Sequence, residues 1–263
     1  MDLDRYVARE SALHRADARV KFVVTIGFIV AVSLLPIGAF LALGGAWLLT
    51  VGLSVVGHLG PLRAARRAFL AAPFLLAALP LVFTRPEDPL GSFGLGPLTI
   101  TISGEGLRLF ATIALKSWIS VQAALLLAFT TPFHELVDGL RQLRLPAIMV
   151  AIISFMYRYL AVLTDEAGRM ARARASRSAD PAERGGGSIR WRARVTGAMV
   201  GTLFLRSYER SERIYAAMQA RGFEGEFRHM HSRALEPTDI AGLVVTLSAL
   251  VILFLIGAFW LPR

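Results

Sequence analysis

Two arginines, Arg177 and Arg221, stand where two predicted helices end, and each is flanked by small residues. The segments read Ser176-Arg177-Ser178 and Ala220-Arg221-Gly222. A guanidinium is always charged and can donate two parallel hydrogen bonds to a carboxylate or phosphate. An arginine at a helix end also complements the negative end of the helix dipole and binds lipid phosphate, so one such motif alone has a structural explanation. Two similar endings on adjacent long helices instead favour a functional role for the two motifs.

Other reactive groups are scarce, and the sequence predicts no catalytic, cofactor-binding or metal-ligating residue. The absence of cysteine excludes disulfides, thiolate nucleophiles and cysteine-ligated metals. Neither lysine, Lys21 or Lys116, follows a glycine-rich phosphate-binding loop, which argues against ATP binding of that kind. The one close histidine pair, His229 and His231, has no acidic cluster beside it. Lys116 falls within a predicted membrane helix, where it serves either an ion path or, as we favour, a structural role.

The composition is that of a membrane protein. Of the 263 residues 55% are hydrophobic and 18% charged, whereas a soluble domain usually has about 25% charged residues. The formal net charge of +10 suits an anionic membrane face or an acidic partner. Four acidic residues interrupt the basic region: Glu209, Glu212, Glu224 and Glu226. This mixture of charges argues against a surface that binds nucleic-acid phosphates.

Five apolar runs approach the roughly 20 residues that a helix needs to cross a bilayer: 20–35, 37–59, 69–83, 107–129 and 240–261. Two further runs, 147–163 and 195–205, are ambiguous. Short cytoplasmic loops are rich in arginine and lysine, and 17 of the 29 basic residues lie between positions 131 and 238. We therefore predict five membrane helices, a cytoplasmic N-terminus and a cytoplasmic region over 132–236.

This organisation divides the chain into four parts: a cytoplasmic segment 1–19, four membrane helices over 20–131, coupling helices over 132–236 and a last membrane helix over 237–263. The segment 84–106 is expected to be an external loop with one strand near 98–102, because it is rich in glycine and proline.

The 132–236 region is expected to hold one short and two long amphipathic helices. The short helix would start with Thr131 as N-cap and Pro132 in its first turn. The second would run from Pro146, and the third from Trp191 to a C′ glycine at Gly222. Ion pairs are expected between Asp165 and Arg169, and between Glu209 and Arg213.

Several segments resemble the transmembrane T components of energy-coupling factor (ECF) transporters, and in particular the CbiQ/NikQ branch of cobalt and nickel importers. The stretch from Ser207 to Phe223 is similar to the second arginine motif of that family, and Ser176-Arg177-Ser178 to the first, where the family often has glycine in place of Ser178. Further similar segments are Asp4-Arg5-Tyr6, the run from Asp17 to Lys21, Glu105-Gly106-Leu107, the run from Thr130 to Phe133 and the run from Met156 to Glu166.

The resemblance implies an all-α membrane scaffold that joins two cytoplasmic ATP-binding-cassette ATPases to a membrane substrate-binding subunit in the bacterial inner membrane. The six residues of the two motifs would contact the ATPases, and the chain itself would catalyse nothing. A T component of a vitamin importer remains an alternative. A second alternative is a self-sufficient secondary transporter. Such a transporter would need buried carboxylates, and these are missing from the predicted spans.

Overall fold

A computed structural model describes residues 6–7, 9, 11–60, 66, 69, 75–76, 78–84, 89–95, 98–177, 188–223 and 236–259. The chain divides into two compact units at about residues 140 and 232. We call the part built from α2, α3, α7 and α11 the four-helix unit. The part built from α9, Ala147–Ala175, and α10, Ile189–Ala220, is the two-helix unit.

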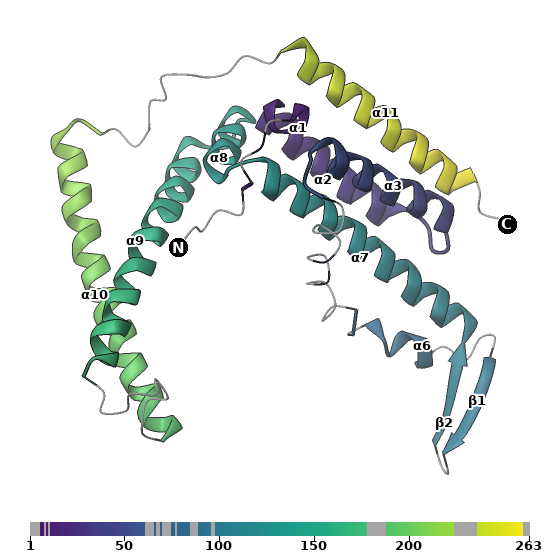
Figure 1. Ribbon diagram of the computed structural model, residues 1–263, viewed down its shortest axis with the longest axis horizontal. Coiled ribbons are helices and arrows are strands. Elements are labelled where there is room, and N and C mark those ends of the chain that lie inside the picture. Colours follow the sequence, from purple (N-terminus) through teal and green to yellow (C-terminus); the bar gives the residue numbers. More distant parts are fainter. Residues whose placement is uncertain are drawn as a thin grey trace. The chain divides into compact units, whose positions relative to one another are not determined.

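The four-helix unit is organised around α7, Gly104–Thr130, which packs against α2, Ala18–Leu34, and α3, Phe40–Val56. The last helix, α11, Pro237–Phe259, packs on α2 and α3. Figure 1 shows these helices running beside one another, with α11 in yellow. Their shared core contains residues from all four helices, among them Phe28, Leu43, Ile119 and Leu250.

Side-chain caps fix where two of these helices start. Asp17 accepts a hydrogen bond from the Arg19 backbone N–H at 2.8 Å and so caps α2, while Ser103 accepts one from the Gly106 N–H at 3.3 Å and caps α7. Such caps satisfy backbone donors that have no partner within the helix. A four-residue helix, α1, Ala12–Arg15, precedes Asp17, and another, α6, Leu81–Thr84, precedes the strands.

Glycine allows α3 and α11 to approach closely at one end. A Cβ atom at Gly45 of α3 would lie 2.8 Å from Leu253 Cδ2 of α11. One at Gly257 of α11 would lie 3.4 Å from Ala42 Cβ of α3 and 2.6 Å from Leu35 Cδ2 at the end of α2. The 2.6 and 2.8 Å distances are too short for non-bonded carbon atoms, so a larger residue at either glycine would force the leucine side chain to move. Small residues at such contacts are typical of helix packing in membranes.

The 84–106 segment contains two strands rather than the single one predicted. Strand β1, Pro89–Leu95, pairs antiparallel with β2, Leu98–Ser103, in a register that places Leu95 opposite Leu98. The alternating sequence of β2 predicted it, but the glycines of β1 concealed the first strand because glycine has low strand propensity. Apart from this hairpin the described elements are helices, and the predicted all-α class is confirmed.

Three described helices are long and apolar enough to cross a membrane: α7, α11 and α9, Ala147–Ala175. The apolar helix α3 is shorter, at 17 residues. The chain is therefore a multi-pass membrane protein. Residues 70–74 and 77 of the predicted span 69–83 lie outside the described residues, so the five-span count stays a prediction. By length and composition α9 now qualifies as a membrane span as well.

The short amphipathic helix predicted after Pro132 is present as α8, Phe133–Gln142. Its predicted cap is wrong. Thr131 instead ends α7, and its buried hydroxyl has no hydrogen-bond partner among the described residues. Gly139 of α8 packs against the start of α2, where an added Cβ would lie 3.3 Å from the Arg19 backbone nitrogen.

Candidate functional site

The first arginine motif lies at the C-terminal end of α9. Ser176 is the C-cap residue, and its hydroxyl donates to the Ala173 carbonyl at 2.9 Å. The Arg177 N–H donates to the Arg174 carbonyl at 3.1 Å, which continues the last turn as a tight i→i−3 bond. Ser178, the third predicted residue of this motif, lies outside the described residues.

The second motif ends α10, Ile189–Ala220, in the way its glycine predicts. Gly222 has a φ of +76°, which favours glycine because it lacks Cβ. The Gly222 N–H donates to the Gln219 carbonyl at 2.9 Å, and the Phe223 N–H to the Met218 carbonyl at 3.0 Å. This pair of bonds is a Schellman motif. It closes the helix directly after Arg221 and confirms Gly222 as the C′ residue.

Both arginines are exposed. Within the part of the chain that the structure describes, neither side chain makes a hydrogen bond or an ion pair. The residues before them, Ser176 and Ala220, are exposed too. Each motif is therefore a small, accessible projection that carries one fixed positive charge, which is the form suited to binding an acidic group on another chain.

The helices α9 and α10 contact each other through charged side chains. Glu166 of α9 accepts a hydrogen bond from Arg206 of α10 at 2.9 Å, and its other oxygen pairs with Arg169. Nearer the α9 end, the Arg174 guanidinium lies 5.9 Å from the centre of the Trp191 ring, within cation–π range.

The ion pairs predicted from helical spacing are wrong. Arg169 pairs with Glu166 instead of Asp165, and no ion pair joins Glu209 and Arg213 in the described part of α10. Glu166 was not predicted because its partner Arg206 is 40 residues away. The only sequence feature that pointed to Glu166 was its position within the stretch from Met156 to Glu166, which resembles the family.

These contacts place the two motifs far apart. Arg177 lies three residues beyond Arg174, which sits over Trp191 near the start of α10. Arg221 lies 30 residues beyond Trp191, and 30 residues of α-helix span about 45 Å. The two arginines therefore lie near opposite ends of α10.

The two lysines have structural partners. Lys21 of α2 donates to the Thr130 carbonyl at the end of α7, at 3.1 Å. Lys116 of α7 donates to the Ser33 and Leu35 carbonyls at the end of α2, at 2.9 and 2.6 Å. This geometry favours the structural interpretation of Lys116 over an ion path.

Among the histidines, His14 is held in place by its neighbours. One ring nitrogen lies 2.7 Å from Ser11 Oγ, and the other lies 3.1 Å from the Val7 carbonyl oxygen. Burial lowers the pKa of His14, although the hydrogen bond to Val7 opposes that shift. His229 and His231 lie outside the described residues, so the structure says nothing of them.

Comparison with known proteins matches residues 9–232 to the CbiQ family, described as cobalt transport protein. The chain is 29% identical to the cobalt transport protein CbiQ of Rhodobacter capsulatus over 253 residues, which cover 95% of this chain and 96% of that protein. It is 28% identical to the ECF transporter transmembrane protein EcfT of Exiguobacterium sibiricum, with 98% of this chain and 100% of that protein covered.

A third relative is named as a putative ABC transporter ATP-binding protein, from Bifidobacterium longum. It is 26% identical over 253 residues, which cover 93% of this chain but only 31% of that protein. The family match spans most of the chain and includes both α9 and α10. The chain therefore belongs to the CbiQ cobalt transport protein family, and it is a transmembrane T component of the energy-coupling factor type.

Proposed function

We propose that this chain is the scaffold of an ECF-type importer for cobalt or nickel ions. In this role it transmits the ATP-driven motion of two cytoplasmic ATPases to a membrane subunit that binds the substrate. The observation that carries the proposal is the pair of exposed, unpaired arginines, Arg177 and Arg221, at the ends of two long helices in the described part of the chain. The chain supplies the mechanical link, and its partners supply ATP hydrolysis and ion recognition.

The separation of the motifs supports two ATPases rather than one. A standard protein interface covers about 800 Å² per partner, equivalent to a disc about 32 Å across. The two arginines are about 45 Å apart along α10, which is more than such a disc spans. Each motif is therefore assigned to its own ATPase, with Ser176 and Ser178 around one arginine and Ala220 and Gly222 around the other.

The two-helix unit is also suited to being covered by partners. No residue of α10 is buried, and several of its large apolar side chains are more than half exposed, among them Val200, Phe204, Leu205 and Tyr208. Exposed apolar surface of this kind marks interaction sites. In this proposal the N-terminal segment 1–19 and the region 132–236 face the cytoplasm of a bacterial cell. The predicted membrane helices within 20–131 and 237–263 lie in the inner membrane, and the loop 84–106 lies outside.

The test uses the full chain co-expressed with its native ATPases and substrate-binding subunit. Arg177→Ala combined with Arg221→Ala should prevent co-purification of the ATPases, or abolish ATP-dependent uptake of Co²⁺ or Ni²⁺ into proteoliposomes. Removing one member of a buried charge pair typically costs about 2–5 kcal/mol. Arg221→Lys should not fully restore uptake, because an ammonium lacks the planar fork.

Arg213→Ala is the matched control, because Arg213 is an exposed arginine of the same helix and exposed ion pairs contribute about 0–1 kcal/mol. Unimpaired uptake by the double variant would contradict the assignment of the arginines. If the complex imported a vitamin instead of a metal ion, the proposed substrate would be wrong. Metal uptake by this chain alone, without ATP, would instead establish a secondary transporter.

A further inference from the structure

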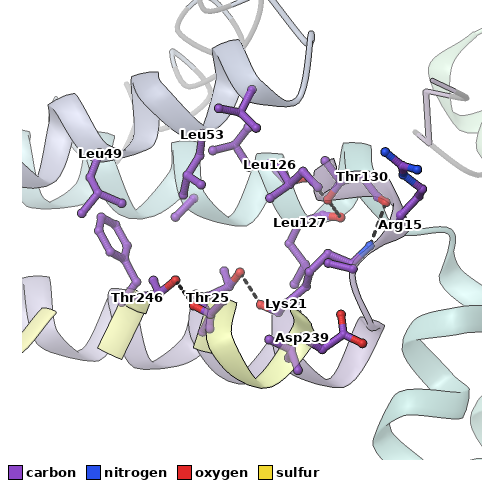
Figure 2. A pocket seen from close by; sticks show the side chains of 18 of the residues that line it. Arg15, Lys21, Thr25, Leu49, Leu53, Leu126, Leu127, Thr130, Asp239 and Thr246 are labelled. Carbon is purple, nitrogen blue, oxygen red and sulfur yellow. Dashed lines mark hydrogen bonds between the residues drawn. The ribbon is translucent and has the colours of Figure 1, made fainter. Parts of the chain in front are cut away.

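A cavity of about 740 Å³ lies inside the four-helix unit, apart from the arginine motifs. Figure 2 shows its wall: Leu49 and Leu53 of α3 lie on one side, Thr25 of α2 and Thr246 of α11 on the other, and Leu126 of α7 behind them. Most of the lining surface is apolar. The charged lining residues gather at one end, near the starts of α2 and α11, at Arg15, Lys21, Glu236 and Asp239.

The polar groups of the wall are already engaged within the protein. Four threonine hydroxyls each donate to a carbonyl of their own helix, from Thr25 to Lys21, Thr50 to Trp47, Thr130 to Leu126 and Thr246 to Gly242. Lys21 donates to the Thr130 carbonyl, and Asp239 accepts from the Asp17 backbone N–H at 3.1 Å. The cavity therefore offers an apolar ligand a good surface and offers a polar ligand few unused partners.

The cavity is bounded on one side by α3 and α11. Gly45 and Gly257 mark a close approach near one end of each of these helices, whereas the cavity is lined by the other end of each helix. The outer faces of both helices next to the cavity are apolar and exposed, at Leu48 and Val55 of α3 and at Val245 of α11. In a membrane these faces contact lipid chains, so the cavity adjoins the hydrocarbon of the bilayer.

The lining selects an apolar occupant that carries a charged group at one end. Arg15 and Lys21 bring positive charge to that end of the cavity, and Glu236 and Asp239 bring negative charge, which suits a zwitterionic head group attached to a hydrocarbon chain. We propose that this cavity binds one acyl chain of a membrane phospholipid, with the lipid head group at the charged end.

The experiment reconstitutes the full chain in phosphatidylethanolamine vesicles that contain a fraction of lipid with a photoactivatable diazirine in the acyl chain. After irradiation, adducts are mapped by mass spectrometry. Leu126 is 6% exposed, so it should react only through a lipid chain inside the cavity. Leu48 is 64% exposed and should react with bulk lipid in every variant, which makes it the internal control for membrane insertion.

Gly242→Leu should abolish the adduct at Leu126, because Gly242 lines the cavity and an added Cβ there has nothing within 4 Å. Thr246→Phe fills the cavity from the next turn of α11 and should also abolish the adduct at Leu126. Gly52→Leu is the matched control. Gly52 of α3 also has nothing within 4 Å of an added Cβ, but it does not line the cavity. The adduct at Leu126 should therefore persist in the Gly52→Leu variant. A missing adduct at Leu126 in the unmodified chain, or one that survives both filling variants, would overturn the proposal.

Discussion

Lys21 and Lys116 are the only lysines among 29 basic residues, and each binds carbonyls at the C-terminal end of the other's helix. The helices α2 and α7 run antiparallel, so the two lysines link opposite ends of the pair. The last carbonyls of a helix lack partners within it and carry the negative end of its dipole. An ammonium, with three donors on a flexible stem, can reach two such carbonyls at once, as Lys116 does.

Lys116→Met is expected to destabilise the four-helix unit by about 1.5–3 kcal/mol, the usual contribution of a hydrogen bond to a charged group. Methionine keeps most of the length of the side chain but leaves the Ser33 and Leu35 carbonyls without their donor. The measurement is the Tm of the chain in detergent. Arg108→Met, which removes an exposed charge from the same helix, should leave the Tm nearly unchanged. An equal loss in both variants would contradict the structural role of Lys116.

The lowered pKa of His14 predicts how the stability of the folded chain changes with pH. Burial lowers its pKa below 6.5, helped by the charges of Lys21, Arg9 and His58 and opposed by the Val7 hydrogen bond. The unfolded chain then binds a proton more readily than the folded one, so the contribution of His14 is complete above pH 6.5 and is lost as the pH falls below it.

Between about pH 7.5 and about pH 5.5, either side of the ordinary histidine pKa, the Tm of the unmodified chain should therefore fall by more than that of His14→Gln. The other titrating groups are common to both proteins, and their effects cancel in this comparison. Parallel pH profiles would show that His14 does not contribute.

At the scale of helices, the relation between α9 and α10 depends on a carboxylate that serves both. Glu166 pairs with Arg169 of its own helix and Arg206 of the other. No residue of α10 is buried, so little apolar packing fixes the geometry of this helix pair, and we expect the charged contact to influence how the two motif arginines are held.

Glu166→Gln should widen the distribution of distances between spin labels placed at exposed positions Ala171 and Ser211. The chain has no native cysteine, so the two labels can be attached without removing other thiols. Glu209→Gln changes an exposed glutamate of α10 that has no ion pair with Arg213 and should leave the distribution unchanged. If Glu166→Gln also had no effect, the Arg206 pair would not hold the helices together.

At the scale of the whole chain, the distribution of arginine predicts the orientation in the membrane. A single cysteine introduced at Gly186 should react only with reagents that enter the cell, whereas one at Pro89 should react with reagents applied outside. The physical reason is that segments rich in arginine are retained on the cytoplasmic side. Labelling of position 186 from outside in intact cells would exclude the five-span arrangement.

The sequence by itself determined the features that depend on neighbouring residues. Apolar runs predicted α3, α7 and α11, spacing of apolar residues predicted α8, and Gly222 predicted the end of α10 because only the local backbone conformation matters there. The arginine motifs and their similarity to a known family were also visible, since they are short contiguous segments. Local interactions were thus sufficient for most of the helices, the membrane class and the family, but not for strand β1.

Only the tertiary structure decided which distant groups meet. The partners of Lys116 lie 81 and 83 residues away in the chain, and Arg206 lies 40 residues from Glu166. Helical spacing predicted Asp165 as the partner of Arg169, but Glu166 faces α10 and binds both arginines. The cavity, too, is lined by residues of α2, α3, α7 and α11, which are far apart in the chain. Contacts of this kind depend on how helices pack against one another, which a periodic pattern in one segment does not encode.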